Sequence, residues 1–322
     1  MNLFGINFGR LWRDVLIVSW ALFKVMIPTL IIVKFAQEAG MVDLLDTVLM
    51  PVTKLIGLPK ELSIVLTTTI LTNPYAGLII LASTDIPGGL TVAQSTILAC
   101  FMLFAHALPI EAAISRQAGA KATFIIVLRL GAAILYCLFL HLFFSYFGLF
   151  ETRALITLPE FKETPTVTAW VINQIKGLVF IQVVIIVLLT ALEILKKLQI
   201  ERLLGYLMSP LLKLIGIGGS ASTIVVVGLT LGLGFGGGLM IKDVKAGNVP
   251  KMDAVAALVF INLFHSVIED TPLVMLLGPS LFYSLIGRLI FALILSYIVI
   301  SFLRMLSPAL SQKIAVNMNC FK

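Results

Sequence analysis

The chain has 322 residues, of which 60% are hydrophobic and only 12% are charged, and its mean hydropathy is +1.09. Ordinary soluble domains carry about 25% charged residues, so this composition excludes a water-soluble globule and indicates an integral membrane protein. The net charge is +7, but the basic residues are scattered over short connections. This distribution argues against nucleic acid as a partner and favours membrane lipid, with lysines and arginines on the cytoplasmic side.

Eight long apolar segments follow one another along the chain, each near the ~20 residues that an α-helix needs to cross the hydrocarbon core. Arg10 and Arg13 precede the first segment, which lacks a small-residue cleavage site and is therefore interpreted as a retained helix. The segments lie at about residues 16–36, 61–83, 92–115, 121–148, 169–195, 219–241, 252–277 and 280–305.

An internal repeat organises these segments. The sequence Pro-Val-Thr-Lys-Leu-Ile-Gly at 51–57 returns as Pro-Leu-Leu-Lys-Leu-Ile-Gly at 210–216, a shift of 159 positions. The same shift pairs His106 with His265 and Arg129 with Arg288, and no insertion is needed between them. Apolar similarity alone would not keep these residue types in one register, so the sequence predicts two copies of one unit. The first occupies 1–148 and the second 169–322, joined by an external loop at 149–168.

Matched connections of the two copies differ in charge. Residues 34–61 hold three lysines and four acidic residues, whereas residues 193–220 hold four basic and two acidic residues. Because lysine and arginine remain on the cytoplasmic side, connections of opposite bias indicate copies that are inverted relative to each other. Both termini are then expected in the cytoplasm, with the protein in the cytoplasmic membrane.

Inverted copies require an odd number of crossings each, so one segment of each copy must enter and leave on the same face. The centre of 61–83 contains Asn73 and Pro74, and the centre of 219–241 is a glycine-rich run, and both favour a turn over a continuous helix. We therefore expect an all-α fold with six spanning helices and two opposed re-entrant helical hairpins. The alternative is eight plain spans in a parallel repeat. Segments 41–58 and 200–216 are expected to be interfacial helices.

Ionisable residues interrupt two expected spans. His106 lies in the middle of 92–115 and is followed by Glu111, and His265 lies in the middle of 252–277. His265 is preceded by Asn262 and followed by Glu269 and Asp270, and the spacing of His265 and Glu269 places them on one face of a continuous helix. Ionisable groups at mid-bilayer cost ~3 kcal/mol or more, which favours a substrate-binding or proton-coupling set. Satisfied structural polar groups are the alternative.

Arg129 and Arg288 also lie within apolar segments. Their depths predict two buried ion pairs related by the repeat, Arg129 with Glu111 and Arg288 with Asp270, that support the scaffold. The alternatives are a gating or proton-coupling role for these pairs, or arginines that each extend to the membrane surface.

The hairpin tips are further candidates for binding a solute or ion, because the ends of half-helices present unpaired peptide groups. One tip offers the side chains of Thr72, Asn73 and Tyr75, and the other offers only backbone at Gly232, Gly234 and Gly236. The spacing of these glycines matches a dinucleotide-binding pattern, but the segment follows no strand, so we expect no nucleotide cofactor.

The unit that runs from the Pro-x-x-Lys-Leu-Ile-Gly motif through the hairpin to the histidine and acid resembles the gate domain, also called the nucleoside recognition domain. This domain is shared by spore-maturation-type membrane proteins, concentrative nucleoside transporters and the permease part of ferrous iron transport GTPases. The resemblance covers nearly the whole chain as two copies and implies hairpins that act as gates. The chain lacks the nucleoside carriers' Gln-Thr-Glu hairpin signature and any GTPase domain, so it is most similar to stand-alone gate proteins.

Three functions are compatible with these features. The first is a secondary transporter that moves a small polar solute or ion, nucleoside-like or cationic, by alternating access. The second is a non-transporting scaffold or partner subunit. The third is an intramembrane metalloenzyme, which is disfavoured because neither copy has a His-Glu-x-x-His pattern. We therefore expect a transporter that is not an enzyme and has no cofactor. A homodimer is compatible with the size of the chain, and the sequence leaves any metal unassigned.

Overall fold

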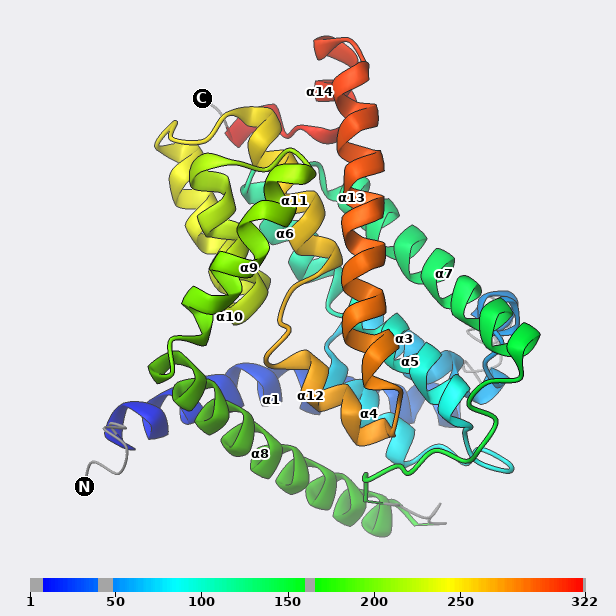
Figure 1. The fold of residues 1–322 in the computed structure, drawn as a ribbon. Coiled ribbons are helices and arrows are strands. Elements are labelled where there is room, and N and C mark those ends of the chain that lie inside the picture. The colour runs from blue at the N-terminus through cyan, green and yellow to red at the C-terminus, as the bar shows by residue number, and fades with distance from the viewer. Residues whose placement is uncertain (1–7, 40–48, 160–165, 321–322) are drawn as a thin grey trace. The chain divides into compact units, whose positions relative to one another are not determined.

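The computed structural model of the protein describes residues 8–39, 49–159 and 166–320 (Figure 1). Within these ranges every regular element is a helix, and the only β-type pairings are two isolated bridges. The expected all-α class is therefore confirmed. Residues 41–48 of the expected interfacial helix and 160–165 of the expected external loop lie outside the described residues.

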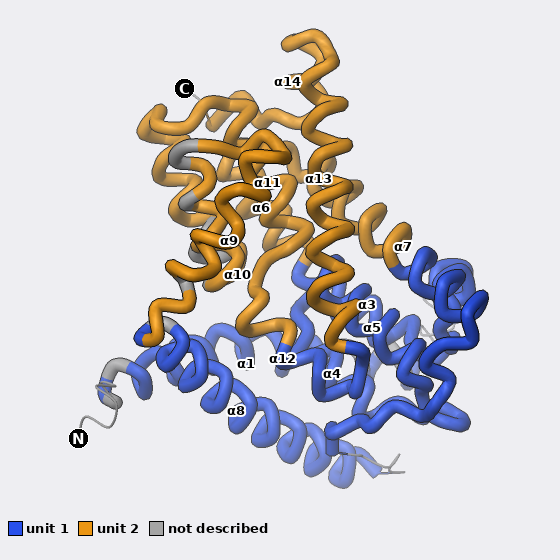
Figure 2. Tube along the Cα trace, in the orientation of Figure 1, with its two compact units in different colours: residues 1–107, 137–197, 272–280 blue, residues 108–136, 198–271, 281–322 orange. Residues whose placement is uncertain are grey.

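The chain forms two compact units, coloured separately in Figure 2. Unit 1 comprises residues 1–107, 137–197 and 272–280, and unit 2 comprises 108–136, 198–271 and 281–322. Each unit therefore takes segments from both copies of the sequence repeat. The repeat copies at 1–148 and 169–322 are defined by sequence similarity, and the division of the chain into these domains stays a prediction.

Unit 1 is built around a helical hairpin. Helices α3 (Ser63–Leu71) and α4 (Pro74–Ala82) pack against each other, and α3 also contacts α5 (Val92–Ala105). The two long helices α1 (Phe8–Glu38) and α8 (Val167–Lys197) contact each other and α4. The remaining elements of this unit are short or are parts of shared helices: η2 (Lys60–Leu62), η3 (Met275–Leu277), the end of α7 (Ala122–Phe147) and the end of α12 (Asp270–Val274).

Unit 2 is centred on α10 (Gly219–Lys245), which contacts α6 (Leu108–Gln117), α9 (Ile200–Leu214) and α11 (Lys251–Leu263) (Figure 1). Helix α11 in turn packs on α13 (Arg288–Met305). The remaining elements are the start of α7, the first residues of α12, the π-helical turn η4 (Phe282–Gly287), α14 (Pro308–Ala315) and η5 (Met318–Cys320).

Five helices of the described residues are long and apolar enough to cross a membrane. They are Leu11–Ile32, Val92–Gln117, Ala122–Phe147, Val167–Leu195 and Phe282–Met305. These correspond to five of the six expected spans. The sixth, at 252–277, is not a continuous helix, because α11 ends at Leu263 and α12 begins only at Asp270. The helical segment at Val92–Gln117 is also interrupted, at His106 and Ala107, so neither histidine lies within a continuous helix.

The centres of both expected hairpins are helix breaks at equivalent repeat positions. Asn73 is extended, with φ −165°, and its side chain accepts a 2.9 Å hydrogen bond from the Ala76 amide at the start of α4. Pro74 follows in the first helical turn, where its missing amide proton is not needed. The equivalent residue in the second copy is Gly232, which interrupts α10 with φ 80° and ψ 174°. Whether these segments enter and leave the membrane on one face stays a prediction.

The breaks at the histidines also follow the repeat. Ala107 and Ser266 stand at equivalent positions and both have positive φ, 49° and 48°. The Ala107 amide donates to the Thr69 carbonyl at 3.0 Å, and the Ser266 amide donates to the Gly228 carbonyl at 3.4 Å. Thr69 and Gly228 are themselves related by the same shift. Each copy therefore anchors its broken histidine helix to the first half of its own hairpin in the same way.

The expected interfacial segments are helical where they are described. Residues 49–55 form a short helix before Gly57, and α9 covers Ile200–Leu214. Helix α9 leaves large apolar side chains exposed, among them Leu203, Tyr206 and Leu207. An amphipathic helix of this kind is typical of a membrane surface.

The turns that follow the two hairpins provide a test of inversion. Pro87 and Ala246 are related by the repeat shift, both are exposed, and both precede a glycine with positive φ. In inverted copies, Pro87→Cys is expected to react with a membrane-impermeant maleimide from outside the cell, and Ala246→Cys from the cytoplasmic side. The background carries Cys320→Ser and retains the buried Cys100 and Cys137. The reagent reaches one face of the membrane in intact vesicles and the other face in inverted vesicles. Reaction of both cysteines in the same kind of vesicle would contradict inversion.

Gly232 permits a test of the second break. Its backbone region is almost exclusive to glycine, and an added Cβ would lie 2.5 Å from the Ser266 Oγ. Gly232→Ala is therefore expected to lower the free energy of unfolding in detergent by about 1–3 kcal/mol. The control is Gly238→Ala in the same helix, where a Cβ meets open space, and alanine should be neutral or stabilising by up to about 1 kcal/mol. Equal stability of the two variants would show that the break is not required.

Candidate functional site

The candidate site in unit 2 is built around the end of α11. The helix stops at Leu263, and Phe264 and Ser266 leave helical geometry, with φ −145° and 48°. The last carbonyl groups of a helix have no partners within it. One of them, that of Ile261, lies 2.8 Å from Nδ1 of His265. The imidazole thus satisfies the backbone at the break and is held in a fixed orientation, with its side chain fully buried.

The second ring nitrogen of His265 faces a carboxylate from another helix. Its Nε2 lies 3.2 Å from Oε1 of Glu111. Because a carbonyl oxygen can only accept a hydrogen bond, the Ile261 contact requires the proton on Nδ1. Both ring nitrogens are therefore engaged, one with the backbone and one with Glu111.

Glu111 is itself held by a buried arginine. It lies in the first turn of α6, where the helix dipole favours a negative charge. Its second oxygen, Oε2, pairs with Nη1 of Arg129 on α7. The contact that we expected between Arg129 and Glu111 is therefore present. The arginine side chain has no exposed surface and the glutamate side chain is 12% exposed, so this is a buried ion pair.

Arg288 binds the backbone at the same break. Its Nη2 donates to the His265 carbonyl at 3.4 Å, and the guanidinium carbon lies 5.0 Å from the centre of the Phe264 ring. The latter geometry is that of a cation–π contact. Both Arg129 and Arg288 are fully buried, which contradicts the alternative that they extend to the surface. The expected pair between Arg288 and Asp270 stays a prediction.

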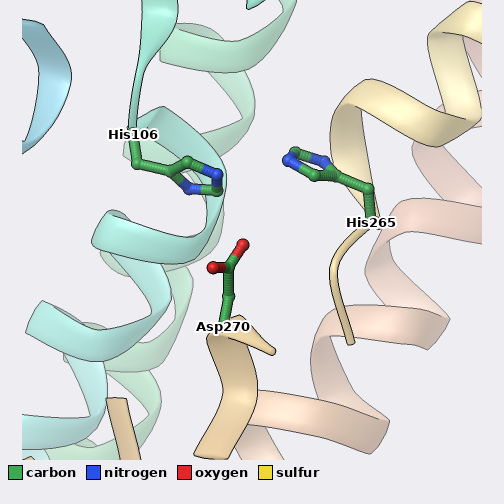
Figure 3. Close-up of side chains that lie close together, drawn as sticks. All are labelled: His106, His265 and Asp270. Atoms are coloured by element: carbon green, nitrogen blue, oxygen red, sulfur yellow. The ribbon is translucent and has the colours of Figure 1, made fainter. Parts of the chain in front are cut away.

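The remaining candidates from the second copy surround His265. Asn262 donates to the Ser115 hydroxyl at 3.0 Å and to the Leu258 carbonyl at 2.9 Å, and so ties α11 to α6. Asp270 is buried, and a carboxylate oxygen lies within 4.8 Å of a ring nitrogen of His265 (Figure 3). Glu269 is half-buried in the turn before α12. The expectation that His265 and Glu269 share one helix face is wrong, because the helix ends between Leu263 and Asp270.

The first-copy candidates lie in unit 1, apart from Glu111 and Arg129. His106, also drawn in Figure 3, caps α5, and its Nδ1 lies 2.9 Å from the Met102 carbonyl, the same local arrangement as at His265. Thr72, Asn73 and Tyr75 are all buried at the first hairpin break. The Thr72 hydroxyl donates to the Thr68 carbonyl at 2.6 Å, and Asn73 caps α4. These two side chains therefore serve the local backbone.

The glycines of the second hairpin differ from one another in conformation. Gly232 is the residue with non-helical backbone angles, whereas Gly234 and Gly236 lie in the helical part of α10 that follows. The glycine run thus supplies one break and a helix beginning just after it. An added Cβ at Gly228, on the preceding half, would lie 3.1 Å from Ile261, so this glycine allows α10 and α11 to approach closely.

The contacts of His265 do not assign a metal. Nδ1 is held by the Ile261 carbonyl, so Nε2 is the ring nitrogen that faces other groups, as in metal-bound histidines. Nε2 and Oε1 of Glu111 lie 3.2 Å apart, a separation that fits both a direct imidazole–carboxylate contact and two ligands of one metal ion. We describe the contact as an imidazole–carboxylate pair and assign no metal.

Comparison with known proteins supports the membrane assignment. The chain is 29% identical over 293 residues to "Uncharacterized membrane protein YvoD" of Bacillus subtilis (strain 168), covering 86% of this chain and 89% of that protein. No family model matches the chain. No solved structure matches it. Together with its long apolar helices, this relative identifies the chain as a multi-pass membrane protein.

The buried ion pair leads to a stability prediction. Arg129→Met leaves the Glu111 carboxylate without its guanidinium and is expected to cost about 3–5 kcal/mol of unfolding free energy. Replacing Glu111 by Met as well removes both charges and should recover most of that loss. The measurement is the unfolding of the purified protein in detergent.

Arg304 provides the matched control for this comparison. It pairs with Asp253 at 3.7 Å in the same unit, but the two side chains are 44% and 38% exposed. Arg304→Met is therefore expected to cost about 1 kcal/mol or less. A loss at Arg129 as small as that at Arg304 would contradict the importance of the buried pair.

Proposed function

We propose that this membrane protein is a secondary transporter that moves a small polar solute or ion, nucleoside-like or cationic, by alternating access. The observation that supports this proposal is the repetition of helix breaks at equivalent positions. Asn73 and His106 mark the breaks in the first copy, and Gly232 and His265 mark those in the second. Irregular backbone is tolerated at membrane depth only where protein shields it or a cavity exposes it to water. Discontinuous helices in inverted repeats form the binding sites of many transporters.

In this proposal the two hairpins act as gates. The α3–α4 hairpin and the two halves of α10 enter the membrane from opposite faces, with both termini in the cytoplasm and the protein in the cytoplasmic membrane. The gate-domain resemblance of the sequence fits this arrangement. The backbone at Gly232 and the helix start that follows it provide peptide groups for a polar solute, and Asn73, Thr72 and Tyr75 line the other tip.

The buried polar residues are assigned two roles. The histidines and acids bind the solute or the coupling ion: His106, Glu111, His265, Glu269 and Asp270, together with Asn262. Arg129 and Arg288 are positioning residues, because Arg129 holds Glu111 and Arg288 holds the carbonyl of His265. Both arginines thus have a partner in their apolar environment, where burial without one is costly.

A non-transporting scaffold or partner subunit is the second candidate. The Asn262 contact with Ser115 and the Arg129 contact with Glu111 both tie separate helices together, as polar residues do in structural membrane bundles. In that case the protein would copurify with a stoichiometric partner, either a second copy or another membrane protein, and would move no solute.

Uptake into proteoliposomes distinguishes the two candidates. The probes are radiolabelled uridine, adenosine, ferrous iron and a set of amino acids, measured against empty liposomes. Wild-type protein is expected to accumulate at least one probe. His265→Ala should reduce uptake roughly 10- to 100-fold, because a hydrogen bond to a charged group contributes about 1.5–3 kcal/mol.

The control for this experiment is His141→Gln, which changes a histidine of unit 1 outside the proposed binding set. Both variants must elute as folded protein in size-exclusion chromatography before reconstitution. Absence of protein-dependent uptake for every probe, with a stoichiometric partner present in the purified material, would favour the scaffold and contradict transport.

A further inference from the structure

We infer that His265 and Glu111 together bind one proton, and that this proton is the coupling ion of the transport cycle. The proton site follows from contacts within unit 2 alone. Its coupling role rests on the proposed function. The inference names both the ion and the two atoms between which it is held, Nε2 of His265 and Oε1 of Glu111.

The contacts of the imidazole ring determine where protons are possible. Nδ1 lies 2.8 Å from the Ile261 carbonyl, which accepts but cannot donate, so Nδ1 carries a proton. In a neutral imidazole the other nitrogen, Nε2, then has only a lone pair. That nitrogen lies 3.2 Å from a carboxylate oxygen, which when ionised also has only lone pairs. Two acceptors repel each other at this distance, and a proton between them removes the repulsion, so we place one proton there.

The proton can belong to either side chain, and the total number of protons on the pair is the same in both arrangements. Either His265 is an imidazolium and Glu111 a carboxylate, or His265 is neutral and Glu111 is a carboxylic acid. The guanidinium of Arg129 on the other carboxylate oxygen favours the ionised form of Glu111, so the proton belongs to Nε2. Release of the proton to water leaves a neutral imidazole and a carboxylate, with no other bond changed.

The surrounding groups make this dyad the site of net charge change. Arg129 lies on α7 and Arg288 lies on α13. Asp270 lies at the start of α12, and Glu269 is half-buried beside it. The formal charges of the two arginines stand against those of three acids, Glu111, Glu269 and Asp270, and the proton adds one positive charge. From α10 the described contacts at this break are carbonyl groups of Gly228 and Leu229, which accept from the amides of Ser266 and Val267. The proton therefore changes the net charge of this cluster.

Release of the proton has a structural consequence within unit 2. Glu111 belongs to α6 of the first repeat copy, and His265 belongs to the break after α11 of the second copy. With the proton present, the imidazolium binds the carboxylate and joins these two segments. Without it, two lone pairs face each other, and the contact between His265 and Glu111 is lost while Arg129 still binds Glu111. The contact between Asn262 and Ser115 ties α11 to α6 in either state, and the proton determines whether the break after α11 is tied to α6 as well. In this proposal that second tie is the link between the proton and the transport cycle.

Nitrogen NMR of the histidine rings tests the proton site without any substrate. The chain has 3 histidines, so ¹⁵N-histidine labelling with His106→Asn and His141→Gln assigns the signals. In the wild type, His265 should keep its Nδ1 proton throughout and lose the Nε2 proton in a single step as pH rises. In Glu111→Gln the amide can donate to Nε2, so the ring should stay neutral and the step should disappear or move to markedly lower pH. Asp253→Asn, at the start of the same helix, should leave the step unchanged.

Several results would overturn the proton site. A neutral His265 with its proton on Nε2 in the wild type would do so from the wild-type spectrum alone, even if Glu111→Gln does not fold. An identical titration in wild type and Glu111→Gln would do so as well. The double variant Arg129→Gln with Glu111→Gln removes both charges together and provides a second folded comparison, in which the step should again be lost.

The coupling role is tested separately in proteoliposomes, with the probe that the wild type accumulates. An inward proton gradient should increase uptake by wild-type protein and have no effect on Glu111→Gln. A titrating dyad combined with uptake that ignores the gradient would overturn proton coupling and leave transport standing. A titrating dyad with no uptake of any probe would overturn the proposed function, and with it the coupling role, but not the proton site.

Discussion

The carboxylate of Glu111, held between Arg129 and His265, is the interaction on which the arrangement of unit 2 depends. Charged groups in an apolar environment are stable only when each has a partner, and this one joins α6, α7 and the break after α11. Arg288 completes the set by binding the carbonyl at the break. Loss of any one member removes a partner from another buried charge or peptide group, which is costly in an apolar environment.

This interaction crosses the repeat. Glu111 and Arg129 come from the first copy and His265 from the second, yet all three lie in one compact unit. The broken helices make this possible, because a break at Ala107 or Ser266 allows the chain to leave one helix direction and start another. Duplication of a unit with such a break supplies two equivalent sets of polar residues. The local contacts at His106 and His265, each to the carbonyl four residues before, show how closely the copies agree.

Much of the architecture could be predicted from the sequence, because polar and glycine residues recur at a fixed shift and so mark equivalent positions in the two copies. The apolar segments located five long helices, the Asn73 and Gly232 positions located the hairpin breaks, and the depth of Arg129 indicated its pairing with Glu111. The breaks at the histidines could not be predicted in the same way. Pro109 and Pro272 lie after the histidines, whereas the helices end before them, through positive φ at Ala107 and Ser266, and positive φ is uncommon for both residue types.

The missed breaks explain the other errors. A continuous helix would have placed Glu269 beside His265, and the actual partner, Glu111, comes from a distant part of the chain that no local spacing indicates. The contacts of Asn262 with Ser115 and of Arg288 with Phe264 were missed for the same reason.

The topology of the chain in the membrane depends on how its charges are distributed relative to a bilayer. The most direct measurement is a cryo-electron microscopy structure in lipid nanodiscs with the bilayer resolved. Inverted copies predict Gly88 and Gly247 on opposite faces, the breaks at Asn73 and Gly232 near the bilayer centre, and Glu111 in contact with His265. Both glycines on one face, or α10 running through the bilayer from side to side, would contradict them.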